Sequence, residues 1–293
     1  MAMLDLTTCL ACRSADLDCV MEPTYQGGVA EAHRFFLSHR ERAVHGRIMR
    51  CRSCGFRFTS PQFAPAEYDR IYGEIPPPPA GAPPSADEQR FVRLARFVRE
   101  RQAPARFLDF GCGGGRFLDQ LPDYRGVGFE VRTGQDLRWD GRICHGELDQ
   151  ARRTLDAFKD GSFDFAVAWD VLEHLPRIED DIRAMHALIR PGGLFFVTVP
   201  DVSAPAAKLL GRRWGCYLLE HLWYFSPTTL GMFMERMGFR RRHDARIGYP
   251  ASLGALVDRI NQTFGLALRP PPAVEAAVMP LPIGLLFGVY ERV

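Results

Sequence analysis

Short apolar runs alternate with amphipathic patterns from about residue 87 onward. The runs occur at residues 106–110, 126–130, 142–146, 163–169, 190–199 and 284–290. Phe163–Trp169 is almost wholly apolar, as expected for a parallel strand buried on both faces. Before the first run, Phe91, Leu94 and Val98 share one face of a predicted helix. Strands that alternate with helices in this way predict an α/β fold.

The first of these runs ends in a glycine-rich turn. Arg106–Phe110 is predicted to be a strand, Gly111–Gly115 a tight turn, and the following residues the first turns of a helix. Glycines there permit backbone conformations that a Cβ would forbid, and they let a ligand lie against the main chain. Glu130 ends the next run, about twenty positions after the first glycine. Nucleotide-binding α/β folds place a carboxylate on ribose hydroxyls at this position.

The glycine spacing helps to decide which nucleotide is bound. A dinucleotide fingerprint requires Gly-x-Gly-x-x-Gly, and Arg116 occupies the position of the third glycine, which weakens the nicotinamide interpretation. The pattern Asp109-x-Gly111-x-Gly113-x-Gly115, with Glu130 at the end of the next strand, instead resembles motif I of the class I S-adenosylmethionine (SAM)-dependent methyltransferases.

Three further segments follow in the order of that family. Gly161–Asp170 is similar to its fourth strand, Val171–Leu175 to the turn after it, and Arg190–Val199 to the entry of its fifth strand. The resemblance covers roughly residues 90–247. It implies a doubly wound, mostly parallel, seven-stranded sheet of Rossmann-like type and methyl transfer from SAM.

The resemblance also implies positions for the cofactor contacts. We expect the glycine turn at the methionine and sugar, Glu130 at the ribose, and Glu147 or Leu148 at the adenine. Asp170 is expected at the methionine portion, with a helix-capping aspartate as the alternative. The expected cofactor-binding residues are Asp109, which orders the turn, Gly111, Gly113, Gly115, Glu130, Glu147, Leu148 and Asp170.

Two Cys-x-x-Cys pairs lie about forty residues apart near the N-terminus, Cys9 with Cys12 and Cys51 with Cys54. In a reducing compartment two such pairs indicate a tetrahedral four-cysteine zinc site, and buried unpaired thiols are the alternative. Such a site is closed, so we expect the zinc to be structural.

The segment between the pairs carries many arginines, and zinc ribbons often bind nucleic acid. Nearby acidic residues dilute this charge, among them Glu31 and Glu41, and the whole chain has a net charge of only +2. We therefore favour a lid that packs on the catalytic domain, without excluding nucleic acid.

An aromatic-rich insertion, Asp201–Phe225, follows the fifth strand and contains a Glu-His-x-x-Tyr-Phe-Ser run. Together with the double Cys-x-x-Cys, this run resembles zinc-containing methyltransferases that act on nucleotide-linked sugars and polysaccharide precursors. The resemblance implies proton removal by Glu220 and His221, and histidine titrates in a suitable range. Ordering of the loop by His221 is the alternative. The expected substrate contacts are Tyr217, Tyr224 and His174, the last also readable as a structural histidine, a base or a metal ligand.

The expected organisation has four parts. These are a zinc-binding module and lid (1–73), a Pro-rich linker (74–86), a SAM-binding domain (87–248) with a substrate insertion (200–225), and a C-terminal extension (249–293) that ends in the last strand of the sheet. The sugar C-methylating relatives carry a further C-terminal domain at the place where this chain has only its short extension.

Composition adds bounds on location and function. The chain is 46% hydrophobic and 25% charged, lacks a basic and apolar leader pattern, and has no run of about twenty apolar residues. We expect a cytoplasmic enzyme without a membrane span. The leading interpretation is methyl transfer to a hydroxyl or activated carbon of a small molecule of sugar or secondary-metabolite type. An RNA methyltransferase that docks through the zinc module is the alternative, and a SAM-binding protein without catalysis is a third.

Overall fold

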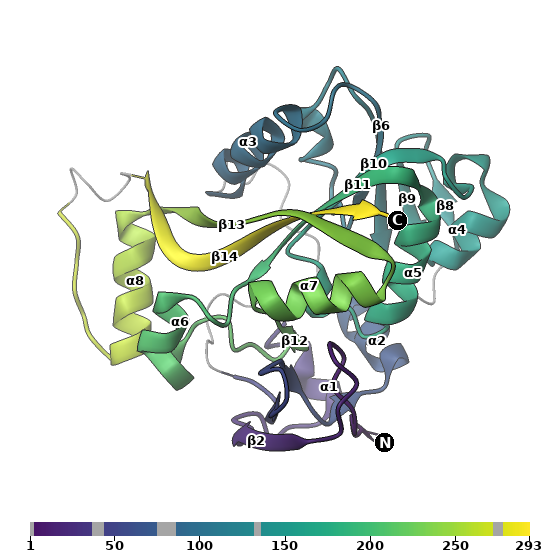
Figure 1. Cartoon of the computed structure of the whole chain (residues 1–293). Coiled ribbons are helices and arrows are strands. Elements are labelled where there is room, and N and C mark those ends of the chain that lie inside the picture. Colours follow the sequence, from purple (N-terminus) through teal and green to yellow (C-terminus); the bar gives the residue numbers. More distant parts are fainter. Residues whose placement is uncertain (1–2, 37–43, 75–85, 132–135, 272–277) are drawn as a thin grey trace.

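The computed structural model describes residues 3–36, 44–74, 86–131, 136–271 and 278–293 (Figure 1). Its central sheet has the strand order β13-β14-β11-β10-β6-β7-β9-β8. The strands are β6 (Arg106–Phe110), β7 (Arg125–Val131), β8 (Arg138–Trp139), β9 (Ile143–Gly146), β10 (Phe163–Trp169), β11 (Ile189–Pro200), β13 (Phe239–Ser252) and β14 (Val278–Arg292).

The five inner strands run parallel, from β9 through β7, β6 and β10 to β11. β14 lies antiparallel between β11 and β13, so the predicted last strand is confirmed. The doubly wound, mostly parallel sheet is confirmed as well. Two-residue β8 adds an antiparallel edge strand beyond the seven expected strands.

Helices cover both faces of this sheet (Figure 1). They are α3 (Ala86–Arg99), α4 (Leu148–Thr154), α5 (Ile178–Leu188), α6 (Pro205–Leu210), α7 (Pro227–Arg236) and α8 (Leu253–Phe264). The start of α7 follows from its sequence. The Ser226 side chain accepts a hydrogen bond from the Thr229 backbone N–H, and the Thr229 side chain accepts one from the Ser226 backbone N–H. Pro227 occupies the first helical position. In α5 the acidic residues of the first turn complement the helix dipole.

The helix predicted directly after the glycine turn is wrong. Only a short 3₁₀ turn forms there, Leu118–Gln120. Gly115 has a φ of +77°, a left-handed conformation that interrupts a right-handed helix, and Pro122 follows the turn. The glycine turn therefore leads into a short irregular connection.

Aromatic rings fill the core around the first strand. Phe107 of β6 stacks on Phe165 of β10 with ring centroids 5.0 Å apart, and Phe117 packs edge-on against Trp169 at 5.1 Å. The buried face of α3 covers this cluster through Leu94, Ala95 and Val98, as its pattern predicts. This packing holds the carboxyl ends of β6 and β10 in fixed positions.

A second sheet, with the strand order β12-β4-β3-β2, takes three of its strands from the N-terminal residues. It consists of β2 (Leu17–Met21), β3 (Ile48–Cys51), β4 (Arg57–Thr59) and β12 (Trp223–Tyr224). The short pair β1 (Met3–Leu4) and β5 (Gln62–Phe63), with helices α1 (Val29–Ala32) and α2 (Pro65–Glu74), completes this part. β12 belongs to the 200–225 insertion, and Trp223 pairs with Phe58. The insertion and the N-terminal residues thus share one sheet.

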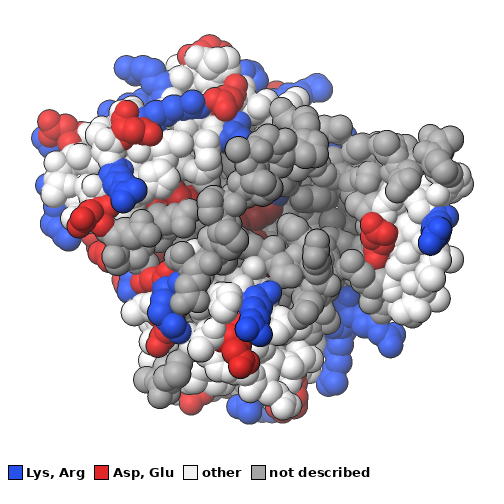
Figure 2. Space-filling view, turned by 180° about the vertical axis from the view of Figure 1, so that it is seen from behind, with Lys and Arg blue, Asp and Glu red and all other residues white. Residues whose placement is uncertain are grey.

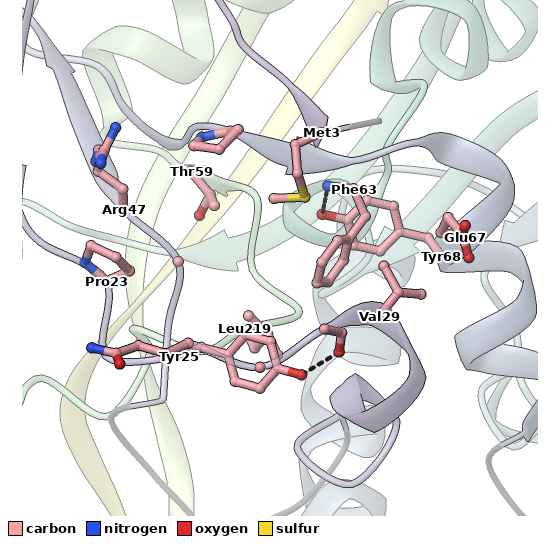
Figure 3. A pocket seen from close by; sticks show the side chains of 15 residues that line it. Met3, Pro23, Tyr25, Val29, Arg47, Thr59, Phe63, Glu67, Tyr68 and Leu219 are labelled. Atoms are coloured by element: carbon pink, nitrogen blue, oxygen red, sulfur yellow. Dashed lines mark hydrogen bonds between the residues drawn. The ribbon is translucent and has the colours of Figure 1, made fainter. Parts of the chain in front are cut away.

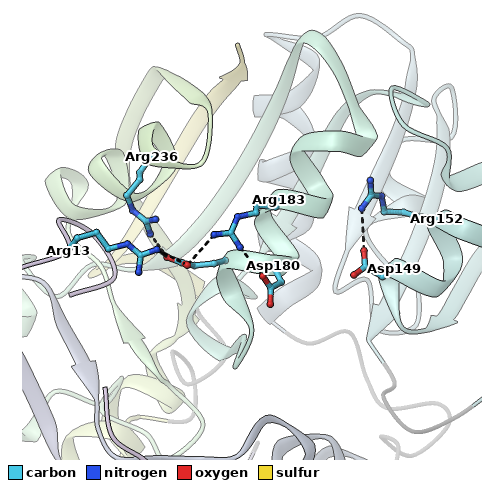
Figure 4. Close-up of polar contacts among 7 residues, drawn as sticks. Arg13, Asp149, Arg152, Asp180, Arg183 and Arg236 are labelled. Carbon is cyan, nitrogen blue, oxygen red and sulfur yellow. Dashed lines mark hydrogen bonds and ion pairs between the residues drawn. The ribbon is translucent and has the colours of Figure 1, made fainter. Parts of the chain in front are cut away.

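Ion pairs also tie the N-terminal part to helices α5 and α7 (Figure 4). Arg13, in the loop of the first cysteine pair, donates to Glu179 of α5 at 2.6 Å. Arg236 of α7 pairs with the same carboxylate and donates to the Leu10 carbonyl at 2.7 Å. The loop that carries Cys9 and Cys12 is therefore fixed against two helices.

The remaining predictions concern the connections. Nearly all of the predicted linker, 75–85, lies outside the described residues; α2 ends at Glu74 and α3 begins at Ala86. β13 leads directly into α8 at the end of its antiparallel pairing with β14 (Figure 1). None of the helices in the described residues is long and apolar enough to cross a bilayer.

Candidate functional site

The glycine turn lies directly beyond the carboxyl end of β6. Gly111 has a φ of +76°, and a Cβ there would approach Val171 Cγ2 to 2.5 Å, so this position requires glycine. A Cβ on Gly113 or Gly114 would meet nothing within 4 Å. The turn thus packs tightly on one side and presents open main chain on the other.

Glu130 joins this turn from the neighbouring strand. The Gly113 N–H donates to Glu130 Oε2 at 2.7 Å, and β7 pairs with β6 in parallel register. The predicted ribose carboxylate therefore lies beside the predicted cofactor turn. Glu147 is exposed at the same sheet edge, two residues after the β7 partner His145, whereas Leu148 is buried against the core.

Asp109 is buried beneath the turn. Its side chain is only 2% exposed, and Oδ2 has no hydrogen-bond partner among the described residues. Burial, and secondarily the charge of Glu130, raises the pKa of Asp109 to about 8. Ordering of the turn by Asp109 stays a prediction.

The pKa of Asp109 leads to a stability prediction for the protein without ligand. Because folding raises the pKa, the stabilising contribution is complete below the unfolded value of about 4 and is lost as pH rises to about 8. Asp109→Asn should match the parent at pH 4 and exceed its unfolding free energy at pH 8. The difference should grow by up to about 1.4 kcal/mol per pH unit in urea titrations. An advantage that is equal at both pH values would contradict the assignment.

Asp170 lies at the carboxyl end of β10 with a φ of +55°. Its Oδ1 accepts from Thr198 Oγ1 at 2.7 Å, and Oδ2 pairs with Arg90. The following 3₁₀ turn has Val171 as its N-cap residue, with no side-chain cap, so the helix-capping alternative is wrong. Sequence reasoning missed Arg90. The feature that could have indicated its burial is its position four residues before Leu94, on the apolar side of α3.

A buried cluster of titratable groups lies next to Asp170. A carboxylate oxygen of Glu173 and one ring nitrogen each from His174 and His221 are within 4.8 Å of one another. The two imidazole centroids are 4.7 Å apart. Tyr72 of α2 reaches this cluster from the N-terminal part, with its hydroxyl 3.4 Å from His174 Nδ1. Divalent metals also use two histidines and a carboxylate as ligands.

Backbone carbonyls orient both imidazoles. His221 Nδ1 is 2.7 Å from the Cys216 carbonyl, and His174 Nδ1 is 3.1 Å from the Glu220 carbonyl. A carbonyl only accepts, so each Nδ1 carries the proton and each Nε2 carries a lone pair. Burial lowers the pKa of His174 to about 4; burial and then His174 hold the pKa of His221 well below its ordinary value.

Glu173 is the least satisfied member of the cluster. It is 1% exposed, and neither carboxylate oxygen has a hydrogen-bond partner among the described residues. Burial, followed by the charge of Asp170, raises its pKa well above the ordinary range. Sequence reasoning placed Glu173 in the turn after the fourth strand but gave it no role, because its neighbours His221 and Tyr72 are distant in sequence.

The predicted substrate tyrosines lie beside this cluster but are largely enclosed. Tyr217 and Tyr224 are 2% and 1% exposed, and their ring centroids are 5.1 Å apart. The Tyr217 hydroxyl accepts from Arg57 Nη1 at 2.8 Å, a partner that the sequence did not reveal. Contact of either ring with a substrate remains a prediction.

Comparison with known proteins identifies the family. A family model described as a methyltransferase domain matches residues 86–243, more than half of the 293-residue chain. The chain belongs to the class I SAM-dependent methyltransferase family. The match includes the glycine turn, Glu130, Asp170 and the Glu173–His174 pair.

Curated relatives of this methyltransferase include ubiquinone biosynthesis O-methyltransferases. The Ralstonia nicotianae protein is 24% identical over 187 residues, which cover 58% of this chain and 79% of that one. The Xanthomonas axonopodis pv. citri protein is 31% identical over 165 residues, covering 51% and 69%. Among solved structures, a SAM-dependent methyltransferase from Archaeoglobus fulgidus has 16% sequence identity and a TM-score of 0.45. The match covers 71% of this chain and 95% of that one.

The methyltransferase also brings its four N-terminal cysteines together. Cys9 Sγ is 3.6 Å from Cys54 Sγ, and Cys12 Sγ is 3.5 Å from Cys51 Sγ. All four sulfurs lie within 4.8 Å of one another. Thiolates at about 2.3 Å from a tetrahedral zinc would be about 3.8 Å apart, so the donor set fits structural zinc.

Proposed function

We propose that this methyltransferase transfers the methyl group of SAM to a hydroxyl oxygen of a small-molecule acceptor. The observation that best supports this proposal is the buried pair of neutral imidazoles, His174 and His221, beside the Asp170 end of β10. A neutral imidazole can accept the proton that a hydroxyl loses on methylation. The names of the O-methyltransferase relatives favour oxygen over carbon as the acceptor atom. A sugar or secondary-metabolite acceptor stays a hypothesis.

For the cofactor, we assign the ribose hydroxyls to Glu130 and the sugar and methionine main-chain contacts to Gly111–Gly115. Open space at Gly113 and Gly114, and the Glu130 carboxylate beside them, support this assignment. Glu147 and Leu148 are assigned to the adenine end. The Arg90–Asp170 pair is assigned to the methionine end, because it adds charged groups at the neighbouring strand terminus.

Proton removal is assigned to His221, with Glu220 beside it. SAM, when bound, would supply a methyl group attached to a positively charged sulfur. The rest of the molecule is the leaving group, a neutral thioether. As the acceptor oxygen bonds the methyl carbon, the carbon–sulfur electron pair stays on sulfur, and the hydroxyl proton passes to His221 Nε2. Glu220 is 6% exposed, and its backbone carbonyl orients His174 Nδ1, so we assign Glu220 a supporting role. Enclosure keeps water from competing for the methyl group.

The zinc module is assigned a structural role at the acceptor side rather than a role in docking RNA. Several of its arginines are paired: Arg50 with Asp18 at 2.7 Å, Arg52 with Asp16 at 3.4 Å, and Arg13 with Glu179. Figure 2 shows basic and acidic side chains interspersed over the described part of one face. Strong RNA binding would instead favour clustered, uncompensated cations.

The test is methyl transfer from radiolabelled SAM into an extract of source cells, separated into RNA, protein and small molecules. Label should enter the small-molecule pool. Glu130→Ala should weaken SAM binding about 10- to 100-fold in calorimetry, the loss expected for a charge-assisted contact. At low SAM it should also reduce labelling. Label in RNA would overturn the proposed acceptor class, and unchanged SAM affinity would overturn the ribose assignment.

A further inference from the structure

A cavity of about 380 Å³ lies within the N-terminal part of the molecule (Figure 3). Its aromatic and aliphatic walls include Tyr25, Val29, Phe63 and Tyr68. Leu219 is the lining residue contributed by the insertion. The volume is in the range of small-molecule sites, and nothing derived above uses it.

Three of the residues that line the cavity lie close to His174 or His221, in sequence or through a hydrogen bond. Leu219 is two residues from His221. Thr59, another lining residue, donates from Oγ1 to the His221 carbonyl at 3.0 Å. Tyr68 lies one helical turn before Tyr72, whose hydroxyl is 3.4 Å from His174 Nδ1. A molecule in the cavity would therefore contact Thr59, which bonds the His221 carbonyl, and α2, which carries Tyr72 to His174.

The lining also indicates the chemistry of the occupant. Aromatic and aliphatic side chains form most of the walls, which suits a flat apolar ring system. Arg47 lies at the end of the cavity away from Phe63 and Tyr68 (Figure 3). Its ion pair with Glu22 is 3.5 Å long and involves side chains that are 45% and 74% exposed, so solvent screens it. An anionic group on a ligand can replace that contact.

We propose that this cavity binds the body of the methyl acceptor, and that the acceptor is an aromatic molecule with one anionic group paired to Arg47. The proposal rests on the small-molecule function proposed above and gives it an acceptor class. It assigns acceptor selection to the N-terminal module together with Leu219, whereas the sequence analysis placed the substrate wall in the 200–225 insertion.

Gly28 offers a substitution that fills the cavity. It lines the space, and a Cβ on it would meet nothing within 4 Å. Its φ of −90° and ψ of 173° are ordinary extended values for any residue. Gly28→Leu should therefore occupy the cavity without backbone strain. Arg47→Gln removes the cation at similar size, and Arg34→Gln, at an exposed arginine outside the lining, is the matched control.

The binding test uses 1-anilinonaphthalene-8-sulfonate, an aromatic probe with one anionic group, and follows its fluorescence with the full-length protein. The parent should bind one probe per chain. Affinity should fall at least about tenfold in Gly28→Leu and about three- to tenfold in Arg47→Gln, because a lost steric fit or charge contact is worth about 1 kcal/mol or more. Arg34→Gln should not change it. Absence of binding, or equal binding by all four proteins, would overturn the proposal.

A second measurement links the cavity to methylation. In the radiolabel assay, Gly28→Leu should label the small-molecule pool at least about tenfold more slowly, with an unchanged Kd for SAM. Undiminished labelling would show that the acceptor does not use the cavity. Label in RNA would instead defeat the proposed function and leave the probe result intact, so the two failures can be told apart.

Discussion

Replacing His221 with asparagine is expected to slow methyl transfer by about 10²- to 10⁴-fold, the usual contribution of a positioned proton acceptor. SAM affinity should stay the same, because His221 is not among the residues assigned to hold the cofactor. The effect should appear in kcat, since the lost interaction is made as the hydroxyl gives up its proton. The measurements are steady-state rates and calorimetric SAM binding, with exposed His243→Ala as the control.

The pH dependence provides a second check on His221. Burial and the neighbouring His174 hold its pKa well below the ordinary value, so the imidazole stays neutral as pH falls from 8 toward 6. The rate should not show a His221 ionisation in that interval. A loss of activity centred near 6.5, or a full dependence on added divalent metal that His221→Asn abolishes, would contradict the role as proton acceptor.

Replacing Cys51 with serine is expected to be the most destabilising change in the N-terminal part. Structural zinc couples its binding energy to folding, so loss of one thiolate should cost on the order of several kcal/mol. The thermal midpoint should fall by about 10 °C or more. The rate of methyl transfer should also fall. Cys51 ends β3, which pairs with β4, and Thr59 of β4 donates a hydrogen bond to the His221 carbonyl.

Cys19→Ser is the matched control, because Cys19 lies outside the cluster and is exposed. Elemental analysis should find one zinc per chain in the parent and in Cys19→Ser, and much less in Cys51→Ser. A metal-free parent with an unchanged thermal midpoint would contradict the zinc assignment. Normal activity in a metal-free Cys51→Ser protein would contradict the expected coupling between the zinc module and His221.

Features carried by contiguous residues were predictable from the sequence. The glycine turn could be located because its glycines, its strand and the Glu130 position lie within one βαβ-like unit, although its connecting helix is nearly absent. The zinc-site hypothesis could also be made from the sequence. Each Cys-x-x-Cys pair spans only four residues, and the two pairs together supply the four ligands of a tetrahedral site. The start of α7 was readable from two adjacent residues, Ser226 and Pro227.

Contacts across the chain were not predictable. His174 and His221 are adjacent only because the insertion folds back over the end of β10, and Tyr72 arrives from a helix on the other side of the linker. Arg90 received no role from the sequence, yet it is 7% exposed and paired with Asp170. Hydrophobic periodicity identifies a buried helix face but does not reveal which polar residue has a buried partner.

The pairing of β12 with β4 affects how such proteins can be recombined. Transplanting residues 200–225 from a relative without its N-terminal residues would remove a matched edge strand and expose the backbone groups of β4. Residues 1–73 and 200–225 are separated by 126 residues in sequence but would have to be exchanged together. Chimaeras that exchange both segments together should fold, and we expect acceptor preference to be transferred with the pair.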